Sequence, residues 1–381
     1  MKKYVLFILT VYVLLYAFAV TAFGEKLNFD SESDINSLIL DEYRDLISSF
    51  DSTLADKLPT DFGTSPEDDA SSLTAWDFIL GMLGESFSSA ALSLLPSFAK
   101  LVCLIVVISV LRQLTSLADP KSADFISSIS SLCISGVFIL SQYDTVVLLK
   151  ERLADMSNLA SCITPILIAL YSAGGNTATA GVSGSALSIF TFTAEEVFSK
   201  MALPFFGAMF CLVTVSSSGA LMLDGFIRTL KKSYTNLITL VMSVFCAILA
   251  SQSLIASARD SVSLRAVKFI TSSSLPVVGS SVGETLKTLA AGVSLLRKSV
   301  GVIGIVMILI MTLPTLILLL LNGSALNFCS SLAETLGCNK EKALLEGISG
   351  IYGCLCATLA VSSVMLVFIL ILLSVSSVAI R

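Results

Sequence analysis

The chain contains no histidine among its 381 residues. Histidine is the side chain that most often acts as a general base or proton carrier near neutral pH, and it is a frequent metal ligand. Its absence excludes Ser-His-Asp triads, HExxH metal sites and histidine proton relays. A P-loop, a dinucleotide fingerprint and metal-binding spacings are also missing, and the GVSGS sequence at 181–185 has no base to activate its serines. We therefore expect no catalytic residue, no cofactor, no metal site and no enzyme activity.

Charge is scarce as well, because only 13% of the residues are charged while 55% are hydrophobic. Soluble domains carry about 25% charged residues. The mean hydropathy of +0.91 and the long uncharged runs indicate an all-α, polytopic membrane protein. The lipid bilayer is the expected surrounding, and nothing in the sequence points to nucleic acid.

Cysteine forms no pattern, although the chain has nine. None of the nine lies between Gly24 and Ala75, and all of them are scattered through apolar segments. We interpret them as small buried hydrophobic residues rather than as a disulfide framework.

Residues 1–24 are typical of a secretory signal peptide. Lys2 and Lys3 precede an apolar run from Tyr4 to Val20, and small residues follow it. An uncleaved anchor helix is the alternative. In both cases the chain beyond residue 24 is expected to be exported.

Residues 25–75 form an acidic segment with thirteen acidic and three basic residues. After Ser33, a plausible N-cap, apolar residues recur at helical spacing and predict a small amphipathic helix. Its apolar positions are Ile35, Leu38, Ile39, Tyr43, Leu46, Ile47 and Phe50. The helix is interpreted either as a pad that packs on the membrane domain or on itself, or as a docking surface for an extracytoplasmic partner.

A helix at 76–98 is expected to lie in the membrane interface, anchored by Trp76, before a multi-span domain at 99–381. The first span ends at Arg112. Clearer spans are predicted at 125–143, 201–223, 233–258, 300–321 and 347–380. The last run is too long for one upright crossing, so its start at Gly347–Gly350 is expected to lie flat or to break.

Two apolar segments are interrupted by glycine and proline, and they predict broken or re-entrant hairpins. Met156–Ala194 contains Pro165 and a Gly-rich centre at 174–185, and Ser263–Ser299 contains a second set of breaks. Irregular backbone at membrane depth survives only where protein or a water-filled cavity covers it. The pore or assembly candidates are Pro165, Gly174, Gly175, Arg265, Lys268, Pro276, Gly279 and Gly283. The alternative assigns the glycines to turns and close helix packing, and the two basic residues to a solvated or lipid-headgroup face.

An internal repeat is also predicted, with halves at 121–231 and 232–342. Pro165 and the sequence AGVS at 180–183 recur 111 residues later as Pro276 and 291–294. Repeats that meet around discontinuous segments commonly form transport pathways. Short basic loops place one face of this arrangement in the cytoplasm, although Arg259–Lys298 carries six bases on the opposite side.

Glu195 and Glu196 are acids in an otherwise apolar region, which makes them candidates for function. The alternative is that both lie at the headgroup level and pair with Lys200.

The stretch RAVKFITSSSLPVVGSSVGETLKTLAAGVSLLRKSVGVIGI, Arg265–Ile305, closely resembles the corresponding stretch of the stage III sporulation protein AE family of endospore-forming bacteria. The signal peptide, the acidic segment and Trp76 before the first span fit the same layout. Glu195 and Glu196 do not belong to the family pattern.

The resemblance implies a non-enzymatic subunit of the channel or secretion-like complex that links mother cell and forespore. It implies a multi-pass protein of the mother-cell membrane around the forespore. The implied partners are the other stage III AA-to-AH proteins and a forespore membrane protein across the intermembrane space. The alternative is a self-contained secondary transporter with the two repeats as its substrate pathway and Glu195 or Glu196 coupling an ion.

Overall fold

A computed structural model describes residues 76–116, 120–173, 185–218, 223–273 and 279–375. The predicted signal peptide, the acidic segment and the candidates Gly174, Gly175 and Pro276 lie outside these residues. Over part of the helices, including 252–299, only the backbone is described.

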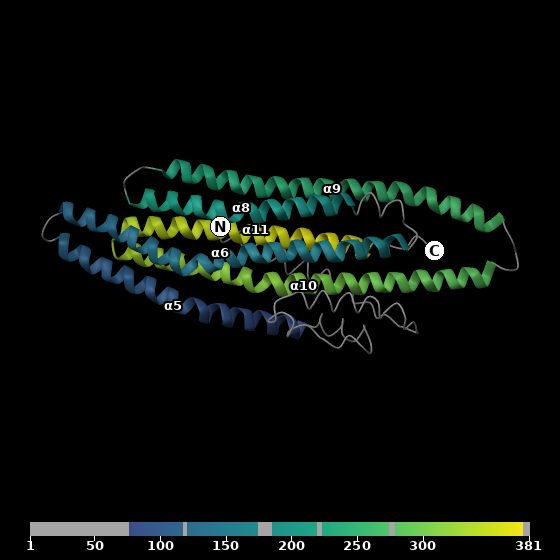
Figure 1. Cartoon of the computed structure of the whole chain (residues 1–381), viewed down its shortest axis with the longest axis horizontal. Helices are drawn as coiled ribbons and strands as arrows, with labels where there is room; N and C mark the ends of the chain where they lie inside the picture. Colours follow the sequence, from purple (N-terminus) through teal and green to yellow (C-terminus); the bar gives the residue numbers. More distant parts are fainter. Residues whose placement is uncertain (1–75, 117–119, 174–184, 219–222, 274–278, 376–381) are drawn as a thin grey trace.

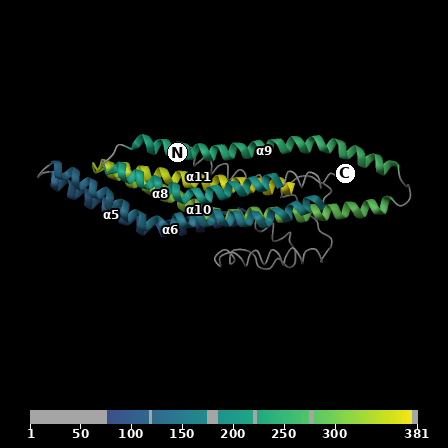
Figure 2. The same cartoon turned by 45° about the horizontal axis from the view of Figure 1, so that its top comes forward.

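Every regular element in the described ranges is an α-helix, which confirms the all-α class. The helices are α5 (Trp76–Ser116), α6 (Pro120–Ala173), α8 (Ser185–Ser217), α9 (Asp224–Ser273), α10 (Gly279–Thr335) and α11 (Asn339–Val375). They lie side by side along one axis of an elongated bundle (Figures 1 and 2). With 57 residues, α10 is about 85 Å long at 1.5 Å per residue, which is well beyond the ~30 Å hydrocarbon core of a bilayer.

Five of these helices contain a segment that is long and apolar enough to cross a membrane. The segments are Leu83–Thr115, Ile189–Ser217, Asp224–Ser251, Gly304–Thr335 and Asn339–Leu372. A sixth is possible in α6, where Ser128–Phe138 and Tyr143–Ile163 meet at a bend of 44°. The prediction of a multi-span membrane protein is confirmed at this level.

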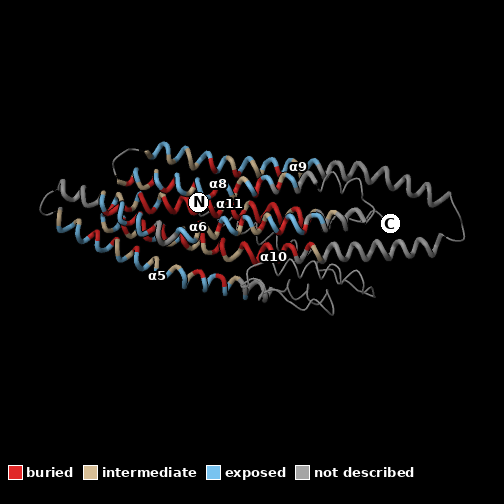
Figure 3. The backbone as a smooth tube through the Cα atoms, in the orientation of Figure 1, coloured by how far each residue is buried: buried red, intermediate tan, exposed pale blue. Residues whose placement is uncertain are grey.

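The core of the bundle lies along α10 and α11, whose buried residues stand out in Figure 3. In α11 the apolar positions face neighbours on all sides, because α10, α6, α8 and α9 all contact it. Aromatic rings from three helices meet around Tyr352, which packs edge-on against Phe138 of α6 and Phe206 of α8. A helix that is apolar all round is expected at such a central position.

Helices end on either side of both predicted interruptions, since α6 stops at Ala173 and α8 starts at Ser185, and α9 stops at Ser273 and α10 starts at Gly279. Two candidate breakers do not interrupt a helix. Pro165 lies inside α6, and Gly283 lies within the first turns of α10. A glycine inside a helix costs only about 1 kcal/mol, and prolines are tolerated in membrane helices whose neighbours satisfy the freed groups.

The expected break at Gly347–Gly350 is wrong, because α11 runs through it without interruption, whereas the alternative that this segment lies flat stays a prediction. The two glycines bring helices together instead. A Cβ on Gly347 would lie 2.6 Å from Cγ1 of Val213, and a Cβ on Gly350 would lie 2.5 Å from Nζ of Lys231. These glycines therefore allow α8 and α9 to approach α11 closely.

Two further boundaries differ from the sequence-based ones. The predicted span at 125–143 and the first leg of the predicted hairpin at 156–194 belong to one helix, α6, which also includes the charged stretch 144–155. The predicted interfacial helix at 76–98 and the first span are one helix, α5. The predicted repeat has an offset of 111 residues, but α6 and α9, the helices before the two interruptions, end 100 residues apart, at Ala173 and Ser273. The internal repeat therefore stays a prediction.

Candidate functional site

Helix α8 carries one face of small and aromatic side chains that is buried in the bundle. Its members recur every three or four residues, as a helix requires: Ala194, Phe198, Ala202, Phe205 and Met209. Glu195 lies next to this face, and only 1% of it is exposed. The helix that carries it is a candidate span, so the carboxylate is placed among apolar side chains within a membrane segment.

Ser362 of α11 supplies the hydrogen bond to this carboxylate. Its hydroxyl donates to Oε2 of Glu195 at 2.9 Å, and Ser362 itself is fully buried. Oε1 of Glu195 has no hydrogen-bond partner among the residues that the structure describes. One turn earlier on α8, the buried Oγ1 of Thr191 has no partner there either. Buried polar atoms are nearly always paired, so these two atoms are exceptions within the described structure.

Glu196 has different surroundings from Glu195, although the two are adjacent in sequence. Its carboxylate lies 2.6 Å from Nζ of Lys200, and both side chains are mostly exposed. Spacing of four residues brings such a pair together on one helix surface. The interfacial pairing considered for both acids thus fits the geometry of Glu196, whereas Glu195 points into the bundle.

A second buried polar contact lies one turn away on α11. The Tyr234 hydroxyl of α9 and the Thr358 hydroxyl are 2.8 Å apart, and Thr358 also donates to the carbonyl of Cys354 at 3.0 Å. The Tyr234 ring stacks on Phe205 of α8 with centroids 3.7 Å apart. Thr358 and Ser362, four residues apart, therefore place two hydroxyls on one side of α11, against α9 and α8.

The sequence did not reveal Ser362, Thr358 or Tyr234. The only local signal is a pair of hydroxyl residues four apart in an apolar run. That signal is weak, because serine and threonine in helices commonly bond to carbonyls of their own helix.

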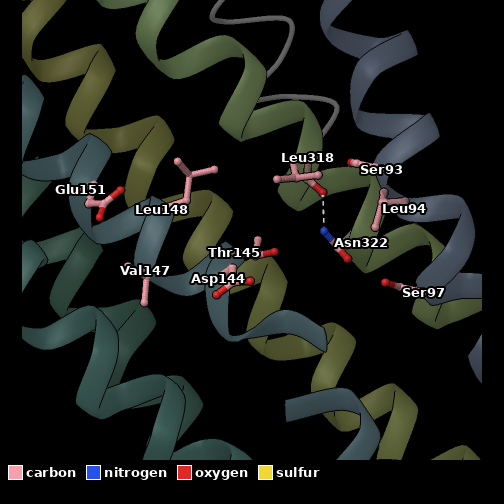
Figure 4. A pocket seen from close by; sticks show the side chains of 10 residues that line it. All are labelled: Ser93, Leu94, Ser97, Asp144, Thr145, Val147, Leu148, Glu151, Leu318 and Asn322. Atoms are coloured by element: carbon pink, nitrogen blue, oxygen red, sulfur yellow. Dashed lines mark hydrogen bonds between the residues drawn. The ribbon is translucent and has the colours of Figure 1, made fainter. Parts of the chain in front are cut away.

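A cavity of about 460 Å³ lies between α5, α6 and α10 (Figure 4). Its lining includes two exposed carboxylates of α6, Asp144 and Glu151, and the hydroxyls of Ser93 and Ser97 on α5. From α10, Asn322 faces the cavity and donates from Nδ2 to the carbonyl of Leu318 at 3.0 Å. The two acids are two helical turns apart on the same face of α6, at the bent candidate span.

The remaining pore or assembly candidates are not brought together with Glu195 by the described backbone. Arg265 and Lys268 lie toward the C-terminal end of α9. Gly279 and Gly283 lie at the start of α10. In the described part of the chain, no group of three or more Cys, Asp or Glu side chains could hold a metal ion.

Comparison with known proteins gives a consistent family. Residues 68–377 match the family described as Stage III sporulation protein AE. A protein named "Stage III sporulation protein AE" from Bacillus subtilis (strain 168) is 22% identical over 218 residues, which are 56% of this chain and 54% of that protein. The chain thus spans about half the length of this curated relative, and no solved structure matches it. Because the family match covers most of the sequence and all six described helices, the chain belongs to the stage III sporulation protein AE family.

Proposed function

We propose that the chain is a non-enzymatic membrane subunit of the channel or secretion-like complex between mother cell and forespore. The single observation that carries this proposal is the family match over 68–377, which spans the whole helical bundle. The name of that family supports a role in sporulation. The apolar helices support residence in a membrane.

The helical architecture supports a subunit that acts through assembly. Candidate spans of 28 to 34 residues exceed the about 20 that a bilayer crossing needs, and α9 and α10 extend further still. Long helices of this kind can reach partners outside the membrane. In this proposal the partners are the other stage III AA-to-AH proteins and a forespore membrane protein. The protein resides in the mother-cell membrane, with its acidic N-terminal segment exported.

To test the proposal, the chromosomal gene for this chain is deleted and then put back, and heat-resistant spores are counted in each strain. Deletion should abolish sporulation after engulfment, and the full chain should restore it. Crosslinking in sporulating cells should recover other stage III AA-to-AH proteins with this chain. Normal spore counts after deletion would refute a sporulation role, whereas a sporulation defect without any such crosslink would refute the assembly role alone.

A second candidate, a self-contained secondary transporter, is favoured by one observation, the buried carboxylate of Glu195. Ion-coupled transporters commonly use an intramembrane acid. Replacing both glutamates, Glu195→Gln with Glu196→Gln, separates the two functions. A transporter should lose activity, whereas a channel subunit should still support sporulation.

Cysteine scanning of 174–185 and 272–283 in a cysteine-free background tests for a conduit. Labelling by a membrane-impermeant thiol reagent is expected at these positions if water reaches the helix interruptions. Uniform protection in the assembled complex would contradict a conduit there.

A further inference from the structure

We propose that Glu195 is a proton-binding site inside the bundle, with the proton held on the carboxyl group between α8 and α11 while the two helices are in contact. Neither the family match nor the proposed channel subunit assigns this role, and the transporter alternative specifies neither the ion nor the groups that hold it. It rests on the surroundings of the carboxyl group alone.

The first step is the lack of a compensating charge on the two helices that form the contact. Glu195 is 1% exposed, and it accepts a hydrogen bond from the hydroxyl of Ser362, which is also buried. A carboxylate buried without a cation is very costly, and such groups are normally paired or neutralised. On α8 the nearest base, Lys200, bonds to Glu196 instead. On α11 the segment 347–375 carries no charge, and its titratable groups Tyr352, Cys354 and Cys356 lie at least six residues from Ser362.

Helix α9 offers no charge at this level either. Contacts of Phe205 with Tyr234 and of Phe190 with Phe245 show that α8 and α9 are antiparallel. Counting between these contacts places residues near 240 opposite Glu195, in the uncharged stretch 233–258. The nearest titratable side chain that faces this region, Tyr234, is engaged with Thr358.

Helix α6 also packs on α8 and carries charges at 150–155. It runs antiparallel to α8 (Figure 1), and Phe138 stacks on Phe210 before the 44° bend of α6, so these charges lie on the part of α6 beyond the bend. The neighbouring cation, Arg152, pairs with Asp155 on its own helix at 3.2 Å. Arg152 is thus engaged with another acid, and the other base of this stretch, Lys150, is exposed.

The second step is that two buried oxygen atoms at the site lack partners. Oε1 of Glu195 and Oγ1 of Thr191 are both buried and unpaired among the described residues. They lie one turn apart on the same face of α8. No hydrogen bond joins the two atoms in the described structure. An ionised carboxylate would leave Oε1 charged and without a donor, whereas a protonated carboxyl group is neutral and costs less to bury.

The consequence is a contact that depends on proton occupancy. While the proton is bound, the carboxyl group is neutral, Ser362 donates to Oε2, and α8 packs on α11. Loss of the proton leaves a charge among apolar side chains, and relief requires water, a cation or separation of the helices.

Dicyclohexylcarbodiimide is the probe for the test, because this apolar reagent adds to protonated carboxyl groups. The full chain is labelled in native membranes at about pH 7, where an ordinary glutamate with a pKa of about 4.3 is almost entirely ionised. Mass spectrometry then locates the adduct on the fragment that carries both glutamates. We expect modification of Glu195 and none of Glu196, so that Glu195→Gln removes the signal and the matched control Glu196→Gln leaves it unchanged.

Sodium ion distinguishes a proton site from a cation site. Labelling is repeated in about 100 mM sodium chloride and in choline chloride at the same ionic strength. Equal labelling supports the proton. Protection by sodium would overturn the proposal in favour of a sodium site built from the same oxygens.

A second measurement does not depend on access of the reagent. The infrared difference spectrum of wild type minus Glu195→Gln, recorded on the purified full chain, should contain the carbonyl band of a protonated carboxyl group. Absence of that band, with a carboxylate band in its place, would overturn the proposal even if no adduct forms. Ser362→Ala should keep the protonated band while shifting its frequency, because the hydrogen bond to Oε2 is lost.

Discussion

Arg112 of α5 donates a hydrogen bond from Nη1 to the carbonyl oxygen of Gly337 at 2.5 Å, joining positions 225 residues apart. Gly337 forms the turn between α10 and α11 with a φ of +75°. The turn closes α10 through two bonds, from Cys338 N to the carbonyl of Ala333 at 2.8 Å and from Gly337 N to that of Glu334 at 3.0 Å. This is the Schellman arrangement of a helix C-terminus. The C-terminal end of α5 is thereby hydrogen-bonded to the turn between α10 and α11.

Gly337→Ala is expected to lower the free energy of unfolding by about 1–2 kcal/mol, because a Cβ is strained in the left-handed region. Gly337→Asn should cost less, since asparagine tolerates this conformation. Unfolding by sodium dodecyl sulfate in mixed micelles measures both. Gly225→Ala is the matched control, because no atom lies within 4 Å of its new Cβ. Equal effects of Ala and Asn at 337 would contradict the role of φ.

Gly347→Ala is expected to destabilise the bundle by about 1–3 kcal/mol through overpacking. The new Cβ would lie 2.6 Å from Cγ1 of Val213, which is buried on α8. Val213→Ala removes that methyl group, so the double variant should be more stable than the sum of the single effects by about 1 kcal/mol. The same micelle titration supplies the four values. Gly323→Ala, with its nearest contact at 3.6 Å, is the control. Additive effects at 347 and 213 would show that the helices adjust independently.

Tyr234→Phe removes the hydroxyl that meets Thr358 and keeps the ring on Phe205. The expected loss is about 0.5–1.5 kcal/mol, the usual net value of an intramolecular hydrogen bond. Part of that cost is the Thr358 hydroxyl that is left buried without Tyr234. The double-mutant cycle of Tyr234→Phe and Thr358→Ala should therefore give a coupling energy close to the full loss caused by Tyr234→Phe. A coupling energy near zero would show that Thr358 is satisfied by the Cys354 carbonyl alone.

The long uncharged runs were sufficient to predict the all-α, multi-span architecture, because bilayer thickness sets the length of an apolar helix. Glycine-rich sequence at 174–185 and Pro276 also marked where helices end. The same reasoning failed at Gly347, where glycine serves close helix packing, and it made no prediction for 144–155, where charged residues continue a helix. Glycine and charge have more than one structural use, and only the tertiary neighbours decide between them.

The sequence singled out Glu195 and Glu196 together, yet it could not separate them. Their difference depends on which face of α8 packs against α11, and on Ser362, which lies 167 residues from Glu195. No local pattern records such a pairing. The acid could be found from the sequence, whereas its hydrogen-bond donor required the fold.

Cys338 provides a test of electrostatics at the α10–α11 turn, outside the candidate spans. Burial raises the pKa of its thiol, and the negative charge of Glu341 raises it further, while Arg112 and Ser109 oppose the rise. Only the thiolate reacts with iodoacetamide, so a lower pKa means faster alkylation at a pH below it. Glu341→Gln removes a negative charge and should lower the thiol pKa, so alkylation should accelerate. Arg112→Gln removes a positive charge and should raise the pKa, so alkylation should slow.

Site-resolved mass spectrometry of Cys338 in the detergent-solubilised chain measures both rates at about pH 8. Each change should stay within about tenfold, since one pKa unit alters the thiolate population tenfold. The opposite directions of the two rate changes serve as the control, because a loosened turn would speed up alkylation of Cys338 in both variants. Acceleration in both would therefore show that access, rather than charge, limits the reaction of this buried thiol.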